Sequence, residues 1–140
     1  MGMILCATRG GEASFRAQDK AIKMAKERGH KLVFLYVIDL HFLDKTAAPL
    51  VVDVEEEVRE MGEFILLMAK ERASKQNIIA KTMCRKGKAK EEIIKIAHKE
   101  DIELVVLGKP AGDDSAFRLS GLKKFAAKIE KETGTKTVIV

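Results

Sequence analysis

Five short apolar runs spaced along the chain constrain its fold more than any other feature. The run KLVFLYVI at residues 31–38 is rich in β-branched and aromatic side chains and lacks a clean alternation of apolar and polar positions. This pattern is typical of a strand that is covered on both faces. The predicted strands lie at residues 3–8, 31–38, 78–84, 102–107 and 137–140.

Segments with apolar residues at helical spacing separate these strands. The first helix begins at Glu12 and ends at a C-cap, Gly29, and the second begins near Asp53, whose side chain suits an N-cap. The third covers residues 89–97, and the fourth covers residues 120–134. Alternating strands and helices predict an α/β fold with an open parallel sheet, helices on both faces and right-handed crossovers.

The second predicted helix has a wider apolar face than contact with one sheet requires. Its apolar residues step by four and three along the segment, at Val54, Val58, Met61, Ile65 and Met68. Phe64 and Leu67 widen this face. We therefore expect this helix to contact a partner as well as the sheet.

The composition limits the classes of partner and the location. A length of 140 residues fits a single domain over residues 1–140. No apolar run is long enough for a membrane helix and the start, MGMILCATRGG, is not a signal peptide, so we expect a cytoplasmic protein with no membrane partner. The net charge is +5, but 26 Lys and Arg are interleaved with 21 Asp and Glu, and one Tyr with no Trp offers little base stacking. These features argue against nucleic acid as a partner.

Residue types that commonly carry catalysis or bind metals show no telling spacing. Cys6 and Cys84 lie in separate predicted strands, which indicates two buried free thiols. The histidines and serines show no base–nucleophile spacing and no nucleophile elbow; they are His30, His41, His98, Ser14, Ser115 and Ser120. The motifs GxGxxG and GxxxxGK[ST] do not occur. We expect no catalytic residue and no metal.

A polar loop with glycines joins the predicted strand at 102–107 to the fourth helix. Strand, glycine loop and helix start is the order that places backbone N–H groups around an anion or a nucleotide. In an open parallel sheet, ligands bind beyond the carboxyl ends of the strands, where the strand order reverses. The alternative is a connector whose glycines only form turns.

Over essentially its whole length, the chain resembles the universal stress protein family. The resemblance is carried by MILCATRGGEAS, LYVID, GKAKEEIIKIAHKEDIELVVLGK and the final TVIV. It implies a three-layer, Rossmann-like fold of the adenine nucleotide α-hydrolase-like type, with a five-stranded parallel sheet of order 3-2-1-4-5. It also implies a homodimer, with Thr137, Val138, Ile139 and Val140 at the dimer edge. Many members bind ATP between strands one and four, and others lack the motif and do not bind it.

The glycine motif of the nucleotide-binding members is partly present. Its pattern is Gly, two residues, Gly, nine residues, then Gly followed by Ser or Thr. Gly108 supplies the first glycine, Ala111 stands at the second with Gly112 one place late, and Gly121 supplies the third. Leu122 stands where the hydroxyl residue belongs. Ser120, one position earlier, is a candidate replacement.

A second departure lies at the end of the first strand. Arg9 stands where members have an aspartate that accepts hydrogen bonds from the nucleoside, and arginine has no acceptor. Losing such a charge-assisted bond costs roughly 1.5–3 kcal/mol. An alternative role for Arg9 is an ion pair with Asp39, Asp113 or Asp114, and the last two are turn formers more often than Mg²⁺ ligands.

The resemblance and the retained groups together give a set of candidate ligand-binding residues. Val37 matches the position that lines the adenine pocket, and Arg9 and Lys109 supply positive charge for phosphate. ATP or another adenine nucleotide is the candidate ligand. The set comprises Ala7, Thr8, Arg9, Gly10, Val37, Asp39, Gly108, Lys109, Ala111, Gly112, Ser120, Gly121 and Leu122.

These observations lead to one expected function and two alternatives. We expect a non-enzymatic, cytosolic stress-response or signalling module that forms a homodimer, has an unidentified protein partner and binds nucleotide weakly or in an altered pose. The first alternative is an ATP-binding switch with slow hydrolysis. The second is a soluble regulatory partner of a membrane transporter. There is also a physical reason to expect a homodimer, because a second copy would cover the open edge of the apolar last strand.

Overall fold

The chain alternates strands and helices from end to end in a computed structural model. The structure describes residues 2–9, 12–40, 48–99, 101–109 and 115–140, and only the backbone of 12–13, 48–53 and 115–118. The elements are β1 (Met3–Ala7), α1 (Glu12–Arg28), β2 (Lys31–Ile38), α2 (Ala48–Ser74), β3 (Ala80–Lys86), α3 (Ala89–Lys99), β4 (Ile102–Leu107), α4 (Ser115–Thr133) and β5 (Lys136–Ile139). All strand pairs are parallel, and the sheet order is β3-β2-β1-β4-β5. The predicted fold class and strand order are confirmed.

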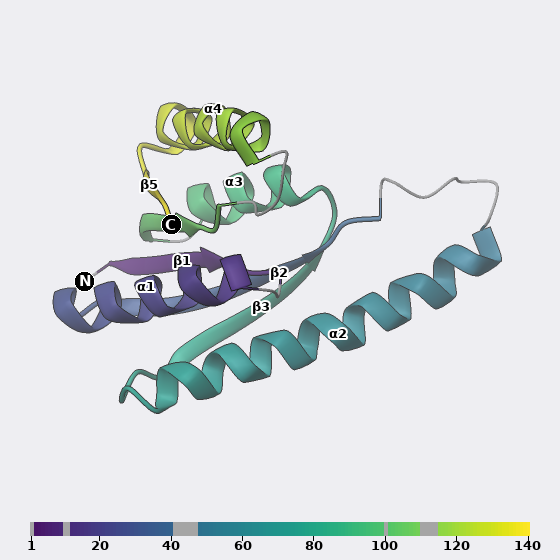
Figure 1. Ribbon diagram of the computed structural model, residues 1–140, viewed down its shortest axis with the longest axis horizontal. Coiled ribbons are helices and arrows are strands. Elements are labelled where there is room, and N and C mark those ends of the chain that lie inside the picture. The colour runs from purple at the N-terminus through teal and green to yellow at the C-terminus, as the bar shows by residue number, and fades with distance from the viewer. Residues whose placement is uncertain (1, 10–11, 41–47, 100, 110–114) are drawn as a thin grey trace.

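Helices cover the sheet on both faces (Figure 1). Helices α1 and α2 pack on one face, and α3 and α4 pack on the other. Along β1, alternate side chains enter different cores: Ile4 and Cys6 face α1 and α2, whereas Leu5 faces α3 and α4. This division explains why the strands read as continuous apolar runs, since neither face of the central strands meets water.

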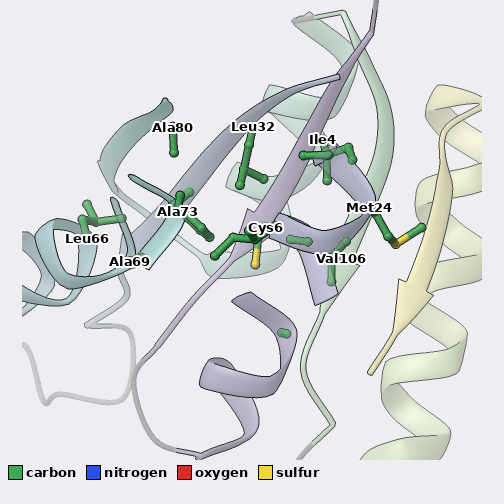
Figure 2. Close-up of a cluster of buried hydrophobic side chains, with 14 of the residues drawn as sticks. Ile4, Cys6, Met24, Leu32, Leu66, Ala69, Ala73, Ala80 and Val106 are labelled. Carbon is green, nitrogen blue, oxygen red and sulfur yellow. The ribbon is translucent and has the colours of Figure 1, made fainter. Parts of the chain in front are cut away.

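Small side chains allow α2 to lie close to the sheet. Figure 2 shows Leu66, Ala69 and Ala73 of α2 beside Leu32 and Ala80 of the sheet. Ala69 and Ala73 have no exposed surface. One turn earlier, Gly62 lies against the ring of Tyr36 on β2, and a Cβ added there would lie 2.4 Å from the ring carbon Cδ1. Glycine is therefore required at this point of contact.

Three predicted starts were wrong by two or more residues. Helix α2 begins at Ala48, so Asp53 is not its N-cap; Pro49, the second residue, suits a first helical turn because its missing N–H has no partner there. Helix α4 begins at Ser115 rather than Ser120 because the intervening residues are good helix formers. Strand β3 begins two residues late because the N–H of Ile78 still bonds the carbonyl of Ala73 at the end of α2.

The two cysteines are free and lie in β1 and β3. Cys6 is fully buried, and this burial raises the pKa of its thiol to about 12. Cys84 is only half-buried, which corrects the expectation that both are buried, and burial raises the pKa of its thiol as well. The described part of the chain contains no helix long and apolar enough to cross a membrane.

Substituting Gly62 with alanine tests the contact between α2 and β2. The added methyl group overlaps the ring of Tyr36, so we expect Gly62→Ala to lower the free energy of unfolding by about 1–3 kcal/mol. Gly121→Ala is the matched control, because Gly121 is also helical and its added Cβ meets no described atom within 4 Å. The control should gain about 0.5–1 kcal/mol in urea denaturation. Equal effects of the two substitutions would contradict this account.

Thiol titration tests the burial of the two cysteines. A buried thiol stays protonated and out of reach of the reagent, so at pH 8 Cys6 should react with a chromogenic disulfide only when the protein unfolds. Cys84 should react slowly in the folded protein. Cys6→Ala and Cys84→Ser variants assign the two phases, and a fast phase that disappears with Cys6→Ala would be the contrary result.

Candidate functional site

The strand order reverses beside β1, and the candidate residues gather there. Strand β1 lies between β2 and β4, and the chain continues from its carboxyl end to α1 on one face and from β4 to α4 on the other. The structure thereby brings Thr8 and Gly108 to neighbouring strand ends, as predicted from the sequence, because Cys6 pairs with Val106. This is the position at which open parallel sheets bind ligands.

Thr8 is a buried structural residue. Only 1% of its surface is exposed, and its N–H donates to the carbonyl oxygen of Leu35 at 2.9 Å. Its Oγ1 accepts a hydrogen bond of 2.7 Å from the side-chain amide of Gln18, which is equally buried. Gln18 belongs to α1, so this bond joins the end of β1 to the helix that covers it. The side chain of Thr8 is thus occupied inside the protein.

Sequence reasoning missed Gln18. The residue lies on the inner face of α1, one helical turn after Ser14, among the alanines that contact the sheet. A polar residue on an otherwise apolar helical face was the available signal, because a buried amide needs a partner. Its Oε1 is buried and has no hydrogen-bond partner among the described residues.

The backbone N–H of Arg9 is hydrogen-bonded within the protein, whereas its side chain is exposed. Its N–H donates to the Oγ of Ser14 at 3.0 Å, within the first turn of α1. The side chain itself is exposed at the carboxyl edge of the sheet. The guanidinium therefore offers donors and positive charge at this edge, whereas the backbone amide does not.

Lys109 likewise has a hydrogen-bonded backbone N–H and an exposed side chain. Its N–H donates to the carbonyl oxygen of Val140 at 2.8 Å, and the N–H of Val140 donates to Leu107 at 2.8 Å. These two bonds extend the pairing of β4 and β5 past the end of both strands. The exposed side chain of Lys109 supplies charge, but its backbone amide is already bonded.

The two candidates at the end of β2 support the neighbouring layer. Val37 is half-buried and packs against the core under α3 and α4. The Oδ2 of Asp39 accepts a 2.9 Å bond from the N–H of Ala89, the first residue of α3. A carboxylate at a helix N-terminus also interacts favourably with the helix dipole. Asp39 thus joins the end of β2 to the start of α3.

The residues of the third motif position lie inside α4. Gly121 is the seventh residue counted from Ser115, and only the first four N–H groups of a helix lack an internal partner. Ser120 is exposed, and Leu122 packs against the core under α3 and α4. Residues 120–122 therefore do not form a helix start with free N–H groups.

Some candidates lie outside the described residues, namely Gly10, Ala111 and Gly112, together with Asp113 and Asp114. Ala7 is the last residue of β1 and Gly108 directly follows β4, and both are half-buried. Within the described residues, no group of three or more His, Cys, Asp or Glu side chains is placed to hold a metal ion.

A surface hollow of about 690 Å³ lies away from this edge, between α1 and the C-terminal end of α2. Arg72 crosses it to pair with Asp19, and its guanidinium lies 5.1 Å from the centre of the Phe15 ring. Its lining is of mixed charge and includes Lys23 and Glu27. These contacts hold the two helices together, and we assign no ligand to this hollow.

A double substitution tests whether Thr8 and Gln18 serve the fold. Thr8→Val removes the partner of a buried amide, so we expect it to lower the free energy of unfolding by about 1–3 kcal/mol. Replacing both partners with apolar groups, as Thr8→Val with Gln18→Leu, should recover most of that loss. Chemical denaturation of the three proteins measures both effects. A double variant that is less stable than Thr8→Val would contradict the pairing.

Comparison with known proteins adds an independent observation. The sequence model described as "Universal stress protein family" matches residues 1–127. The universal stress protein YxiE of Bacillus subtilis (strain 168) is 28% identical over 137 residues, covering 86% of this chain and 82% of YxiE. The universal stress protein UspA from Lactobacillus plantarum has a TM-score of 0.84 at 16% identity, covering 99% of this chain and 97% of UspA. A universal stress protein family protein from Arabidopsis thaliana with AMP bound has a TM-score of 0.64 at 11% identity, covering 100% and 91%.

Proposed function

Because this chain belongs to the universal stress protein family, we propose that it acts in the cytoplasm as a non-enzymatic stress-response or signalling module that binds adenine nucleotides weakly or in an altered pose. The observation that carries this proposal is the state of the backbone amides at the carboxyl edge of the sheet. The N–H groups of Thr8, Arg9 and Lys109 all donate to protein acceptors. A ligand that used them would have to break these bonds.

The side chains at the same edge favour phosphate over nucleoside as the recognised group. By its resemblance to the family, the chain should have a nucleoside-binding carboxylate at the position of Arg9, and arginine has five donors and no acceptor. Arg9 and Lys109 are both exposed and positively charged. Charge-assisted bonds to phosphate are stronger than neutral ones. We therefore propose a phosphorylated ligand held mainly by these two side chains, which follow the neighbouring strands β1 and β4.

Adenine nucleotides are the first ligands to test. The Arabidopsis relative, which shares the fold, was solved with AMP bound. In this chain, Val37 keeps the position that lines the adenine pocket of the family, while Asp39 caps α3. We therefore propose that nucleotides bind at the same place as in the family but with lower affinity.

Calorimetric titration with ATP and Mg²⁺ tests this proposal. We expect no measurable micromolar binding to the nucleotide-stripped wild type. Arg9→Asp restores an acceptor for the nucleoside and should tighten binding about tenfold or more, the gain expected for a charge-assisted bond. The matched control is Arg28→Asp, an exposed arginine at the far end of α1. Micromolar binding by the wild type would overturn the proposal, and equal effects of the two variants would remove the role of Arg9.

We also propose a homodimer through β5. This strand is bonded to β4 on one side only, and its other edge lies at the end of the sheet. Val138 and Val140 are half-buried against the core under α1 and α2, so the edge is apolar. Pairing with β5 of a second copy would satisfy the backbone groups of this edge.

Val138→Lys tests the β5 dimer. The lysine brings like charges together where the two strands meet, so we expect analytical ultracentrifugation to show a smaller assembly than the wild type. Circular dichroism checks that the variant is folded. A wild type that is monomeric at micromolar concentration would contradict the proposed dimer.

A further inference from the structure

Helix α2 has a second apolar face, opposite the one that packs on the sheet. Large apolar side chains on this outer face are strongly exposed: Met61 by 59%, Phe64 by 62%, Leu67 by 54% and Met68 by 37%. At 3.6 residues per turn they project nearly opposite to the buried Leu66, Ala69 and Ala73. Among the described residues, the one other exposed large apolar side chain is Ile79. Contiguous exposed apolar surface of this kind marks interaction sites.

The outer face has the spacing of a helix–helix seam. Residues 57, 61, 64, 68, 71 and 75 follow one another by alternating steps of four and three. This is the spacing with which two helices pack side by side in coiled coils. The apolar residues stand at the centre of the seam, and charged residues stand at its ends. Over residues 57–75 the seam is about 27 Å long at 1.5 Å per residue.

Charge is distributed unevenly along the exposed surface of α2. Its middle part carries exposed Glu56, Glu57, Glu60 and Glu63 with one opposing charge, Arg59. Its C-terminal part, with the turn that follows, carries exposed Lys70 and Lys75 with one opposing charge, Glu71. The dipole of α2 does not explain the acidic part, since its influence fades within the first turn and Glu57 lies nine residues after Ala48. The basic part lies at the C-terminal end of α2, where the dipole also favours cations.

We propose that the outer face of α2 binds α2 of a second copy of this chain in an antiparallel pair related by a two-fold axis. With the axis beside residue 66, Phe64 of one copy lies against Met68 of the other, and Glu57 lies opposite Lys75. The symmetry forms each contact twice. Antiparallel packing is favoured because it places the acidic part of each helix against the basic part of its mate.

The α2 pair is compatible with an assembly through β5. Helix α2 covers β2 and β3, whereas β5 forms the opposite edge of the sheet (Figure 1). The surface of α2 and the edge of β5 do not overlap, so both two-fold interfaces can form in the same assembly. With both present, we expect the wild type to be larger than a dimer.

Analytical ultracentrifugation of exposed-residue variants tests the α2 pair. Phe64→Glu places a charge in the seam without removing a core side chain and should weaken association through α2 about a hundredfold or more. Ile79→Glu adds the same charge at a site that is 92% exposed and outside the seam, and should change nothing. In a Val138→Lys background, the chain should remain a dimer, and adding Phe64→Glu should make it a monomer.

The outcomes separate this inference from the β5 dimer. If Val138→Lys alone gives a monomer, the α2 pair is overturned and the β5 dimer stands. If Phe64→Glu alone gives a monomer while Val138→Lys leaves the assembly unchanged, the α2 pair stands and the β5 dimer falls. Equal assembly sizes for the Phe64→Glu and Ile79→Glu proteins would also overturn the α2 pair, and the outer face would then belong to a different partner.

A charge exchange tests the antiparallel orientation. Glu57→Lys and Lys75→Glu should each weaken association in the Val138→Lys background, because each places like charges opposite one another. The double exchange restores opposite charges and should restore association. Because salt screens charge pairs, this association should weaken more with added salt than an apolar contact does. Failure of the double variant to recover association would overturn the antiparallel arrangement.

Discussion

The central strand β1 is the constraint on which the rest of the structure depends. It pairs with β2 on one side and β4 on the other, and its side chains enter both cores. Every helix packs on a sheet that β1 divides into two halves. Because the chain continues from β1 to α1 on one face and from β4 to α4 on the other, the carboxyl end of β1 is the position at which open parallel sheets bind ligands. Fold and candidate site share the same residues there.

Several polar groups at the carboxyl edge of the sheet are hydrogen-bonded within the protein. Thr8 and Gln18 tie β1 to α1, Asp39 begins α3, and Lys109 continues the pairing of β4 with β5. The bonds of Thr8 and Asp39 join the sheet to a helix, the bond of Lys109 joins two strands, and each occupies a polar group at this edge. The charged side chains of Arg9 and Lys109 remain exposed above these junctions. These positive charges support the proposal that the site attracts anionic groups more than it encloses a nucleoside.

The sequence predicted the strands and the two covered faces, because apolar runs and helical spacing report burial directly. The strand order was predicted only through the resemblance to a known family. It did not predict that α2 begins at Ala48 or that Gly121 lies well inside α4, since helix starts depend on short signals that several nearby residues can supply. Nor did it reveal the bond between Lys109 and Val140, which joins distant positions that only the folded sheet brings together. The exposed apolar residues of α2 were visible as a pattern, but their orientation away from the sheet required the structure.

The most direct test of the central claim is amide hydrogen exchange by NMR at Thr8, Arg9 and Lys109, with and without ATP and Mg²⁺. If these amides are occupied within the protein, they exchange slowly without ligand and keep the same rates and chemical shifts when ATP is added. Fast exchange in the free protein, or large shifts of all three amides at micromolar ATP, would show that the crevice offers its backbone to the nucleotide and would contradict the account.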